Sequence, residues 1–262
     1  MQLSKHYVPT SDYAIPVLEL LPDGAARPPA VILCPGAGGD KYQVLENMAR
    51  LAECGLATLS LDGPELGERR TALGMPRAAV EGPSAHMRWL EMGLQYARDF
   101  AAVLTWWLAQ GRIDADRLGA WGRSFGANCL FYALQDERRI RAAAAVIGTP
   151  NNLETLRRRL ELLSDRGPGP TSEMWQEAQR RFGPRTAVEN VGKLVHLPLL
   201  ACWGADDTTM PLETVTVPFV ERMEAWPQPK AEFVHRVYPG TGHAATAAMQ
   251  ADWIAWFRKH LA

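Results

Sequence analysis

Short, continuously apolar segments alternate with helix-like segments along most of this chain, and this alternation restricts its fold more than any other feature. Strands are predicted at residues 15–22, 30–36, 56–63, 117–122, 141–148, 198–204 and 231–240. Helices are predicted at 42–55, within 86–110, from 124 to about 135, and at 247–261. Strands without a polar face are typical of a mostly parallel sheet covered by helices on both faces. Such α/β sheets bind ligands at the carboxyl ends of their strands.

A long segment separates the predicted strands at 141–148 and 198–204. It has about 50 residues, which is too many for a simple crossover loop. Four leucines recur there at helical spacing, and the stretch SEMWQEAQRRFG predicts a second helix; the leucines are Leu153, Leu156, Leu160 and Leu163. The stretch RGPGP between the two helices is typical of a joint. We therefore expect a single domain over residues 1–262, with a small helical lid inserted at 150–194.

The composition excludes several classes of function. Of the 262 residues, 47% are hydrophobic, and the formal net charge of −1 gives no electrostatic reason to bind nucleic acid or a membrane. No stretch approaches the ~18 apolar residues of a membrane span, and the first residues lack the apolar core of a signal peptide. The four cysteines are scattered without metal-ligand spacing, as is typical of reduced core thiols. These features predict a cytoplasmic protein.

The sequence LGAWGRSFGAN, residues 118–128, places Ser124 between two glycines directly after an apolar run. A strand, a serine and then a helix form the context of the nucleophile elbow, G-x-S-x-G. Gly122 and Gly126 would let the helix pass close to the strand, while the turn forces strained backbone angles on the serine. The hydroxyl would then lie at a helix N-terminus, whose dipole favours developing negative charge. A tight turn without chemistry is the alternative interpretation.

A serine nucleophile needs a base within hydrogen-bond reach, and His243 is the expected one. The stretch YPGTGHAA places it just past the carboxyl end of the last strand, at the same sheet edge as Ser124. The acid that orients the imidazole is expected in CWGADDTTMP, residues 202–211, where Asp207 is preferred and Asp206 is the alternative. The order serine, aspartate, histidine is that of α/β-hydrolases.

Acyl transfer also requires N–H groups directed at an oxyanion. One is expected from the backbone of Phe125, the residue after the nucleophile. The second is expected from the loop CPGAGGDK, where we favour the N–H of Ala37, since its glycine neighbours allow the backbone to approach a substrate closely. A plain glycine-rich turn is the alternative.

With these residues, the chain resembles the α/β-hydrolase superfamily over nearly its whole length. It looks most like the dienelactone-hydrolase-like and prolyl-oligopeptidase-like serine hydrolases and the small bacterial esterases among them. RIDADRLGAWGRSFGAN resembles their strand–elbow signature, and GTGH resembles their histidine loop. WGADDTTMP is similar to their G-x-x-D-x-x-V-P acid loop, which selects Asp207. LDGPELGERR is similar to their D-x-P-G-x-G-E segment, but Pro35-Gly36 stands where most relatives have His-Gly.

The resemblance implies an α/β-hydrolase fold with a Ser124, Asp207 and His243 triad and oxyanion donors at Ala37 and Phe125. We expect a carboxylesterase that cleaves small acyl esters through an acyl-enzyme, without a cofactor or metal. The partner is a small-molecule ester in an apolar pocket, not nucleic acid or a membrane, and no oligomeric state is assigned. The same triad could instead cleave a C–C bond of a β-diketone, or a small peptide or amide. A binding protein that has lost catalysis is least favoured, since no triad member is missing.

Overall fold

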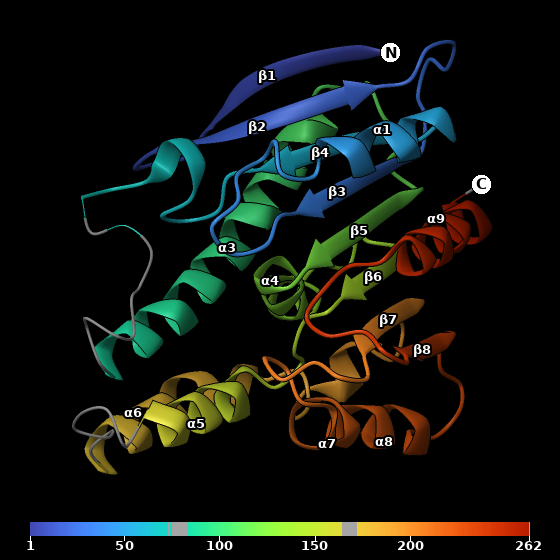
Figure 1. Cartoon of the computed structure of the whole chain (residues 1–262). Coiled ribbons are helices and arrows are strands. Elements are labelled where there is room, and N and C mark those ends of the chain that lie inside the picture. Colours follow the sequence, from blue (N-terminus) through green and yellow to red (C-terminus); the bar gives the residue numbers. More distant parts are fainter. Residues whose placement is uncertain (73, 75–82, 164–171, 262) are drawn as a thin grey trace.

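The computed structural model describes residues 1–72, 74, 83–163 and 172–261. Eight strands form one sheet at its centre, in the order β1-β2-β4-β3-β5-β6-β7-β8 (Figure 1). The strands are β1 (Gln2–Pro9), β2 (Ala14–Leu21), β3 (Ala30–Cys34), β4 (Ala57–Leu61), β5 (Leu118–Arg123), β6 (Ala142–Val146), β7 (Leu199–Gly204) and β8 (Phe233–Tyr238). The pairs β1–β2 and β2–β4 are antiparallel, and the others are parallel. This is the mostly parallel sheet of the α/β-hydrolase fold, as predicted.

Both faces of the sheet are buried, because successive side chains of a strand point to opposite faces and the central strands are apolar throughout. In β3, Ile32 and Cys34 pack into one core cluster, while Val31 and Leu33 pack into another. The first cluster includes side chains of α3 (Pro83–Ala109), α4 (Phe125–Ala133) and α8 (Val217–Ala225). The second includes those of α1 (Leu45–Glu53) and α9 (Ala247–Leu261). Helices therefore cover both faces of the sheet.

Strand β1 is not predicted by the apolar runs. Most of its residues are exposed or half-buried, and only Val8 is fully buried. It pairs with β2 alone, at the edge of the sheet, where a strand can keep polar and charged side chains in solvent. Its register is fixed along the whole strand, from Gln2 opposite Leu21 to Pro9 opposite Ala14.

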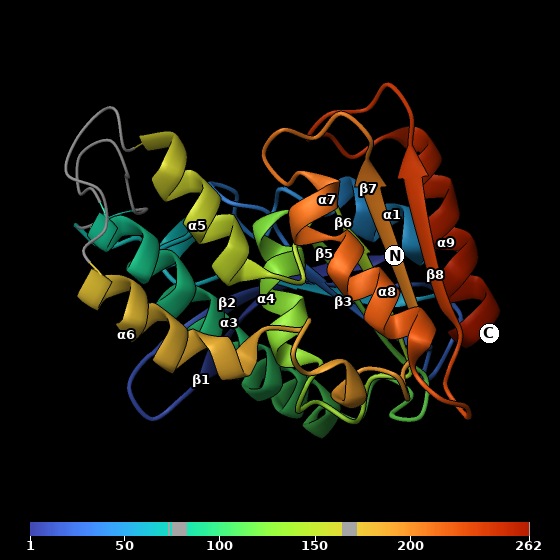
Figure 2. The ribbon, with the colours of Figure 1, turned by 90° about the horizontal axis from the view of Figure 1, so that it is seen from below.

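The segment between β6 and β7 contains α5 (Asn152–Leu163) and α6 (Ser172–Phe182), the two helices expected at 150–194. Seen from below, they lie beside the first turns of α3 (Figure 2). Leu156, Ala178 and Phe182 form a separate apolar cluster with Leu90 of α3. The side chains of Leu160 and Leu163, and the RGPGP joint at 166–170, lie outside the described residues.

Shorter elements complete the fold. Within the described residues they include α7 (Leu212–Val215) and the 3₁₀ turns η1 (Gly67–Arg69), η3 (Gly183–Arg185) and η4 (Val191–Lys193). Across the described residues, none of the helices combines the length and the apolar character that a bilayer crossing requires.

Candidate active site

Ser124 occupies the single-residue turn between β5 and α4, with φ of 52° and ψ of −118°. A positive φ is rare and strained for a residue with a side chain, so close packing around the turn must hold it. A Cβ on Gly126 would lie 2.1 Å from the carbonyl oxygen of Cys34, and one on Gly122 would lie 2.7 Å from Cα of Ala127. Only glycine fits at both positions, which explains why the serine stands between two of them.

Ser124 and His243 are in hydrogen-bond contact, although 119 residues separate them in sequence. The Oγ atom of Ser124 lies 2.8 Å from Nε2 of His243, and Nδ1 of His243 lies 2.7 Å from Oδ2 of Asp207. The three residues follow the carboxyl ends of β5, β8 and β7 respectively. The structure thus brings together the serine, the histidine and the preferred aspartate in one hydrogen-bonded chain.

Asp207 is buried and held by its own loop. Its Oδ1 atom accepts the backbone N–H groups of Thr209 and Met210, both at 2.9 Å, so both carboxylate oxygens are bonded. Burial alone would raise the pKa of Asp207, but the hydrogen bond from His243 and those from the two amides outweigh it and hold this pKa below its ordinary value. The carboxylate is therefore ionised at neutral pH.

The histidine loop lies directly against the end of β7. A Cβ on Gly204 would come within 2.3 Å of the Thr241 carbonyl oxygen. The same carbonyl accepts the backbone N–H of Asp206 at 2.9 Å. The side chain of Asp206 is exposed, and no hydrogen bond joins it to His243. The loop that carries His243 is thereby fixed to the loop that carries Asp207.

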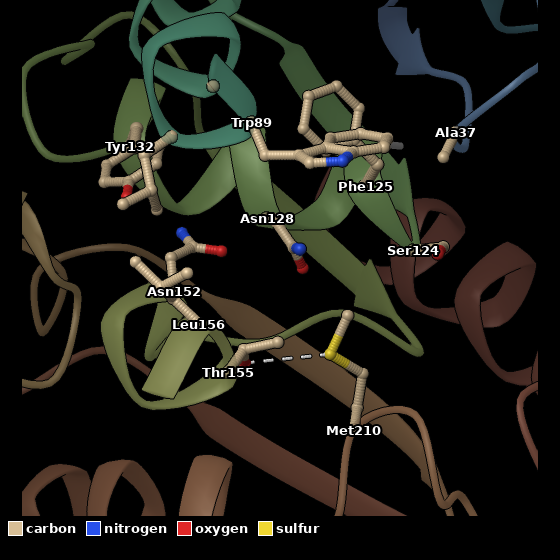
Figure 3. Close-up of a pocket in the computed structure, with 12 residues that line it drawn as sticks. Ala37, Trp89, Ser124, Phe125, Asn128, Tyr132, Asn152, Thr155, Leu156 and Met210 are labelled. Atoms are coloured by element: carbon tan, nitrogen blue, oxygen red, sulfur yellow. Dashed lines mark hydrogen bonds between the residues drawn. The ribbon is translucent and has the colours of Figure 1, made fainter. Parts of the chain in front are cut away.

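The two expected oxyanion donors, Ala37 and Phe125, line the same cavity as Ser124 (Figure 3). Phe125 is the first residue of α4, and the first N–H groups of a helix have no intrahelical partner. Ala37 lies in the exposed loop after β3. The N–H of Gly36, next to it, donates to Oε1 of Gln43 at 2.8 Å. Gln43 thus braces this loop, which has Pro35-Gly36 in place of the usual His-Gly.

An ion cluster fastens the other end of that loop, and the sequence analysis did not predict it. Lys41 is 1% exposed, and its Nζ atom lies 3.0 Å from Oδ2 of Asp62 and 2.5 Å from Oε1 of Glu68. Its backbone N–H donates to Oδ1 of Asp62 at 2.8 Å. Burial alone would lower the pKa of Lys41, but the hydrogen bonds to Glu68 and Asp62 raise it on balance. The segment LDGPELGERR is the sequence signal, since it supplies both carboxylates.

The cavity beside Ser124 has a volume of about 110 Å³. Trp89 and Phe125 form one wall, with ring centroids 4.7 Å apart and an interplanar angle of 73°. Leu156 and Met210 lie opposite (Figure 3). The expected apolar lining is therefore present, and Leu156 comes from the leucine face of α5. Four polar residues that the sequence analysis did not predict also line the cavity.

Those polar residues are Asn128, Tyr132, Asn152 and Thr155. Asn128 and Tyr132 lie three and seven residues beyond Phe125, so all three share one face of α4. This spacing was the available signal. None of the described residues that line the cavity carries a charge.

The described residues contain no cluster of potential metal ligands. There, no three or more histidine, cysteine, aspartate or glutamate side chains are arranged to hold a metal ion. The cysteines Cys34, Cys129 and Cys202 are buried thiols, and Cys54 is exposed. Burial raises the pKa of the Cys34 thiol to about 12, so this sulfur is not a thiolate at neutral pH.

Comparison with known families identifies the chain. The family model for the prolyl oligopeptidase family matches residues 85–262 of this chain. The match covers more than half of the chain and includes the loops that carry Ser124, Asp207 and His243. The chain belongs to the prolyl oligopeptidase family. Together with the fold, this membership confirms the resemblance stated above.

Individual relatives are more distant. A Bacillus subtilis (strain 168) protein named "Putative esterase YitV" is 26% identical over 185 residues, which are 70% of each chain. The first curated relatives, uncharacterised Escherichia coli proteins that are 28% identical over 122 residues, are matched over only 37% of their own length.

Among solved structures, TT1662 from Thermus thermophilus has a TM-score of 0.73 at 18% identity. The match covers 100% of this chain and 99% of the TT1662 chain. A structure titled "Putative Dienelactone Hydrolase" from Klebsiella pneumoniae has a TM-score of 0.67 at 20% identity, with 98% of both chains covered. At these identities the likeness concerns the fold.

Proposed function

We propose that the protein is a carboxylesterase that cleaves small acyl esters through Ser124, His243 and Asp207. The observation that carries this proposal is the unbroken hydrogen-bonded chain from the Ser124 hydroxyl to the Asp207 carboxylate. An ionised carboxylate only accepts hydrogen bonds, so Nδ1 of His243 must carry the proton that faces it. Nε2 is then free to accept the proton of Ser124, as a general base does.

The reaction would begin when Ser124 Oγ attacks the ester carbonyl carbon while its proton passes to His243. The carbonyl oxygen becomes an oxyanion, which the N–H groups of Ala37 and Phe125 would stabilise. His243 then protonates the alcohol oxygen as the C–O bond breaks, and an acyl-enzyme remains. His243 next removes a proton from a water molecule, which attacks the acyl carbon. As the bond between this carbon and Ser124 Oγ breaks, His243 returns the proton to Oγ and the acid leaves.

The cavity volume of about 110 Å³ supports a small acyl group. Segment 150–194 contributes Asn152, Thr155 and Leu156 to this cavity from α5. We therefore propose that α5 and α6 act as the lid of the site within a single domain. A lid of this kind excludes water from the oxyanion, which strengthens the hydrogen bonds that stabilise it.

Hydrolysis of a short peptide or amide is the second candidate, because the family match points to peptidases. Its chemistry would use the same residues, with an amine in place of the alcohol as the group that His243 protonates. Ester and amide hydrolysis would therefore use the same catalytic residues and differ only in the residues that contact the leaving group.

The test is a side-by-side assay of p-nitrophenyl acetate and butyrate, an aminoacyl p-nitroanilide and a vinylogous β-diketone. We expect ester turnover to dominate, and labelling by a fluorophosphonate probe at Ser124. The Ser124→Ala variant should lose both labelling and turnover, with a loss in turnover of about 10⁶-fold. Faster cleavage of the anilide or the diketone would replace the ester assignment, and labelling of Ser124→Ala would remove the proposed nucleophile.

A further inference from the structure

The cavity extends away from the reacting atoms along one side of α4. Phe125, Asn128 and Tyr132 follow one another on this side, and a helix rises 1.5 Å per residue. Asn128 therefore begins about 4.5 Å beyond Phe125, and Tyr132 about 10 Å beyond it. Long side chains on a helix lean toward its N-terminus, so Tyr132 reaches back toward Ser124. Figure 3 shows Tyr132 and Asn152 at the end of the cavity that is far from Ser124.

The occupant of this cavity is the acyl part of the substrate. Ala37, Ser124 and Phe125 line the cavity at one end, which places the ester carbonyl there. His243 does not line it, and His243 is the group that must protonate the leaving alcohol. The alcohol therefore lies outside, on the His243 side of Ser124, and the chain attached to the carbonyl carbon enters the cavity.

The Tyr132 hydroxyl is buried, and no hydrogen bond of ordinary geometry engages it among the described residues. The amide of Asn152 lies beside it and acts as a hydrogen-bond donor that partly offsets the effect of burial on the Tyr132 pKa, which leaves the O–H of Tyr132 without an acceptor. The residue is 2% exposed. Burial raises the pKa of the Tyr132 phenol, so the group stays neutral and can donate. An unsatisfied buried donor costs free energy, and in native structures such a group has a specific explanation.

Amide groups extend this polar region toward Ser124. The Oδ1 atom of Asn128 accepts the backbone N–H of Thr149 at 2.6 Å, which fixes the orientation of the amide. Its Nδ2 hydrogens remain as donors to the cavity. Asn152, at the first turn of α5, is 7% exposed and points its amide toward Asn128 (Figure 3). The region therefore offers donors from two helices, and none of the described residues that line it has a charged side chain to pair with a charged ligand.

We propose that Asn128, Tyr132 and Asn152 bind a neutral oxygen on the acyl chain, so that the enzyme prefers esters of oxo or hydroxy acids to esters of plain alkanoic acids. This inference rests on the proposed esterase function and names its substrate class. A carboxylate or ammonium group at the same place would be buried without a counter-charge. A plain alkyl chain would leave the Tyr132 O–H and the Asn128 N–H donors without an acceptor, which is how a hydrogen-bonding site rejects such an analogue.

The experiment compares p-nitrophenyl levulinate with p-nitrophenyl pentanoate, which differ by a ketone in place of one methylene. In levulinate the ketone carbon lies three bonds from the ester carbonyl carbon. A second pair, the 5-oxohexanoate and hexanoate esters, places the ketone one bond further along the acyl chain, toward Tyr132. We expect kcat/KM for one of the oxo esters to exceed that for its alkanoate by about tenfold or more.

The Tyr132→Phe and Asn152→Leu variants should each bring this ratio close to one. The matched control is Thr155→Val, because Thr155 also lines the cavity but its hydroxyl already donates to the Asn151 carbonyl at 3.1 Å. It should keep the wild-type ratio. The inference is overturned if the kcat/KM ratio of oxo ester to alkanoate is near one for both pairs in the wild type, as it would be if an ordered water satisfied Tyr132. It is also overturned if neither Tyr132→Phe nor Asn152→Leu changes this ratio.

A binding measurement separates this inference from the proposed function. Ser124→Ala is titrated with methyl levulinate and methyl pentanoate by calorimetry, alone and with Tyr132→Phe added. Tighter binding of methyl levulinate, lost in the double variant, supports the inference. Equal binding of the two esters overturns it. Hydrolysis of either ester by Ser124→Ala would show that Ser124 is not the nucleophile. The comparison of methyl levulinate and methyl pentanoate binding, with and without Tyr132→Phe, would still test the inference.

Discussion

Asp206 and Asp207 are adjacent in sequence, but only Asp207 faces His243. Its Oδ2 atom lies 2.7 Å from Nδ1 of the imidazole, and the residue is 4% exposed. Asp206 is exposed, and it is the backbone of this residue, not its carboxylate, that contacts the histidine loop, through the Thr241 carbonyl. The two carboxylates therefore have separable roles.

Substitution of each aspartate in turn tests this separation. Asp207→Asn should lower kcat for p-nitrophenyl butyrate by about 10⁴-fold, because an amide favours the wrong imidazole tautomer. The kcat of Asp206→Asn, the matched control, should stay within about twofold of wild type, because this side chain is exposed and His243 is bonded to Asp207 instead. Steady-state kinetics with circular dichroism as a check on folding decide the matter. A larger loss of kcat in Asp206→Asn than in Asp207→Asn would make Asp206 the acid of the triad.

Gly126→Ala should destabilise the protein. The new Cβ would lie 2.1 Å from the Cys34 carbonyl and 2.4 Å from the Pro35 carbonyl, and neither backbone atom can move without shifting β3 or its loop. Overpacking of this kind costs about 1–3 kcal/mol. Gly36→Ala is the control, since its Cβ would meet nothing closer than 3.5 Å. Urea denaturation of both variants measures the difference, and equal midpoints would contradict the packing argument.

The ion cluster at Lys41 predicts a specific loss of stability in acid. Hydrogen bonds from Lys41, Lys5 and Tyr7 lower the pKa of Glu68 from 4.5 to about 2. A carboxyl whose folded pKa is depressed contributes stability above its unfolded pKa, and this contribution is lost as pH falls from 4.5 through about 2. Since the Glu68 side chain is 39% exposed, solvent screening reduces the size of the effect.

Denaturation midpoints between neutral pH and about pH 2 test this contribution. Glu68→Gln should be less stable than wild type at neutral pH, and its stability should fall less in acid. Glu221→Gln, which removes an exposed carboxylate on α8, should follow the wild-type curve. Parallel curves for wild type and Glu68→Gln would show that the hydrogen bonds to Glu68 do not contribute.

Trp89 limits the length of the acyl chain in our proposal, because its ring packs against Phe125 at the wall of the cavity. Trp89→Ala should raise the ratio of octanoate to butyrate turnover by about tenfold or more, since each methylene admitted to an apolar pocket is worth about 1–3 kcal/mol. Trp226→Ala, at the end of α8 and outside this cavity, is the matched control. An unchanged acyl-length profile in Trp89→Ala would mean that the acyl chain lies elsewhere.

The sequence predicts much of the fold because its strands are apolar on both faces and end in recognisable turns. Strands β2 to β8 fall where the apolar runs lie, and the elbow at Ser124 follows from two glycines that only a tight strand–helix turn requires. His243, which contacts Ser124, and Asp207, which contacts His243, were predicted because each follows the end of a parallel strand, and all such ends meet at one edge.

The parts that were missed depend on contacts between distant residues. Burial of Lys41 is unexpected for a lysine and follows only from Asp62 and Glu68, which lie 21 and 27 residues further along the chain. Strand β1 has the alternating exposure of an edge and therefore no apolar run. Asn128 and Tyr132 share the face of α4 that carries Phe125, but this spacing alone does not show that the face borders a cavity, because the opposite wall comes from the distant α5.

Helix α4 has two duties at once, since its first turn positions Ser124 and its side lines the acyl cavity. A substitution that reshapes the cavity from α4 therefore also disturbs the nucleophile. The opposite wall is different: α5 carries no proposed catalytic residue, whereas Met210 belongs to the loop that holds the Asp207 carboxylate. Divergence toward new acyl groups, in nature or by engineering, should accordingly proceed through α5 while α4 is retained.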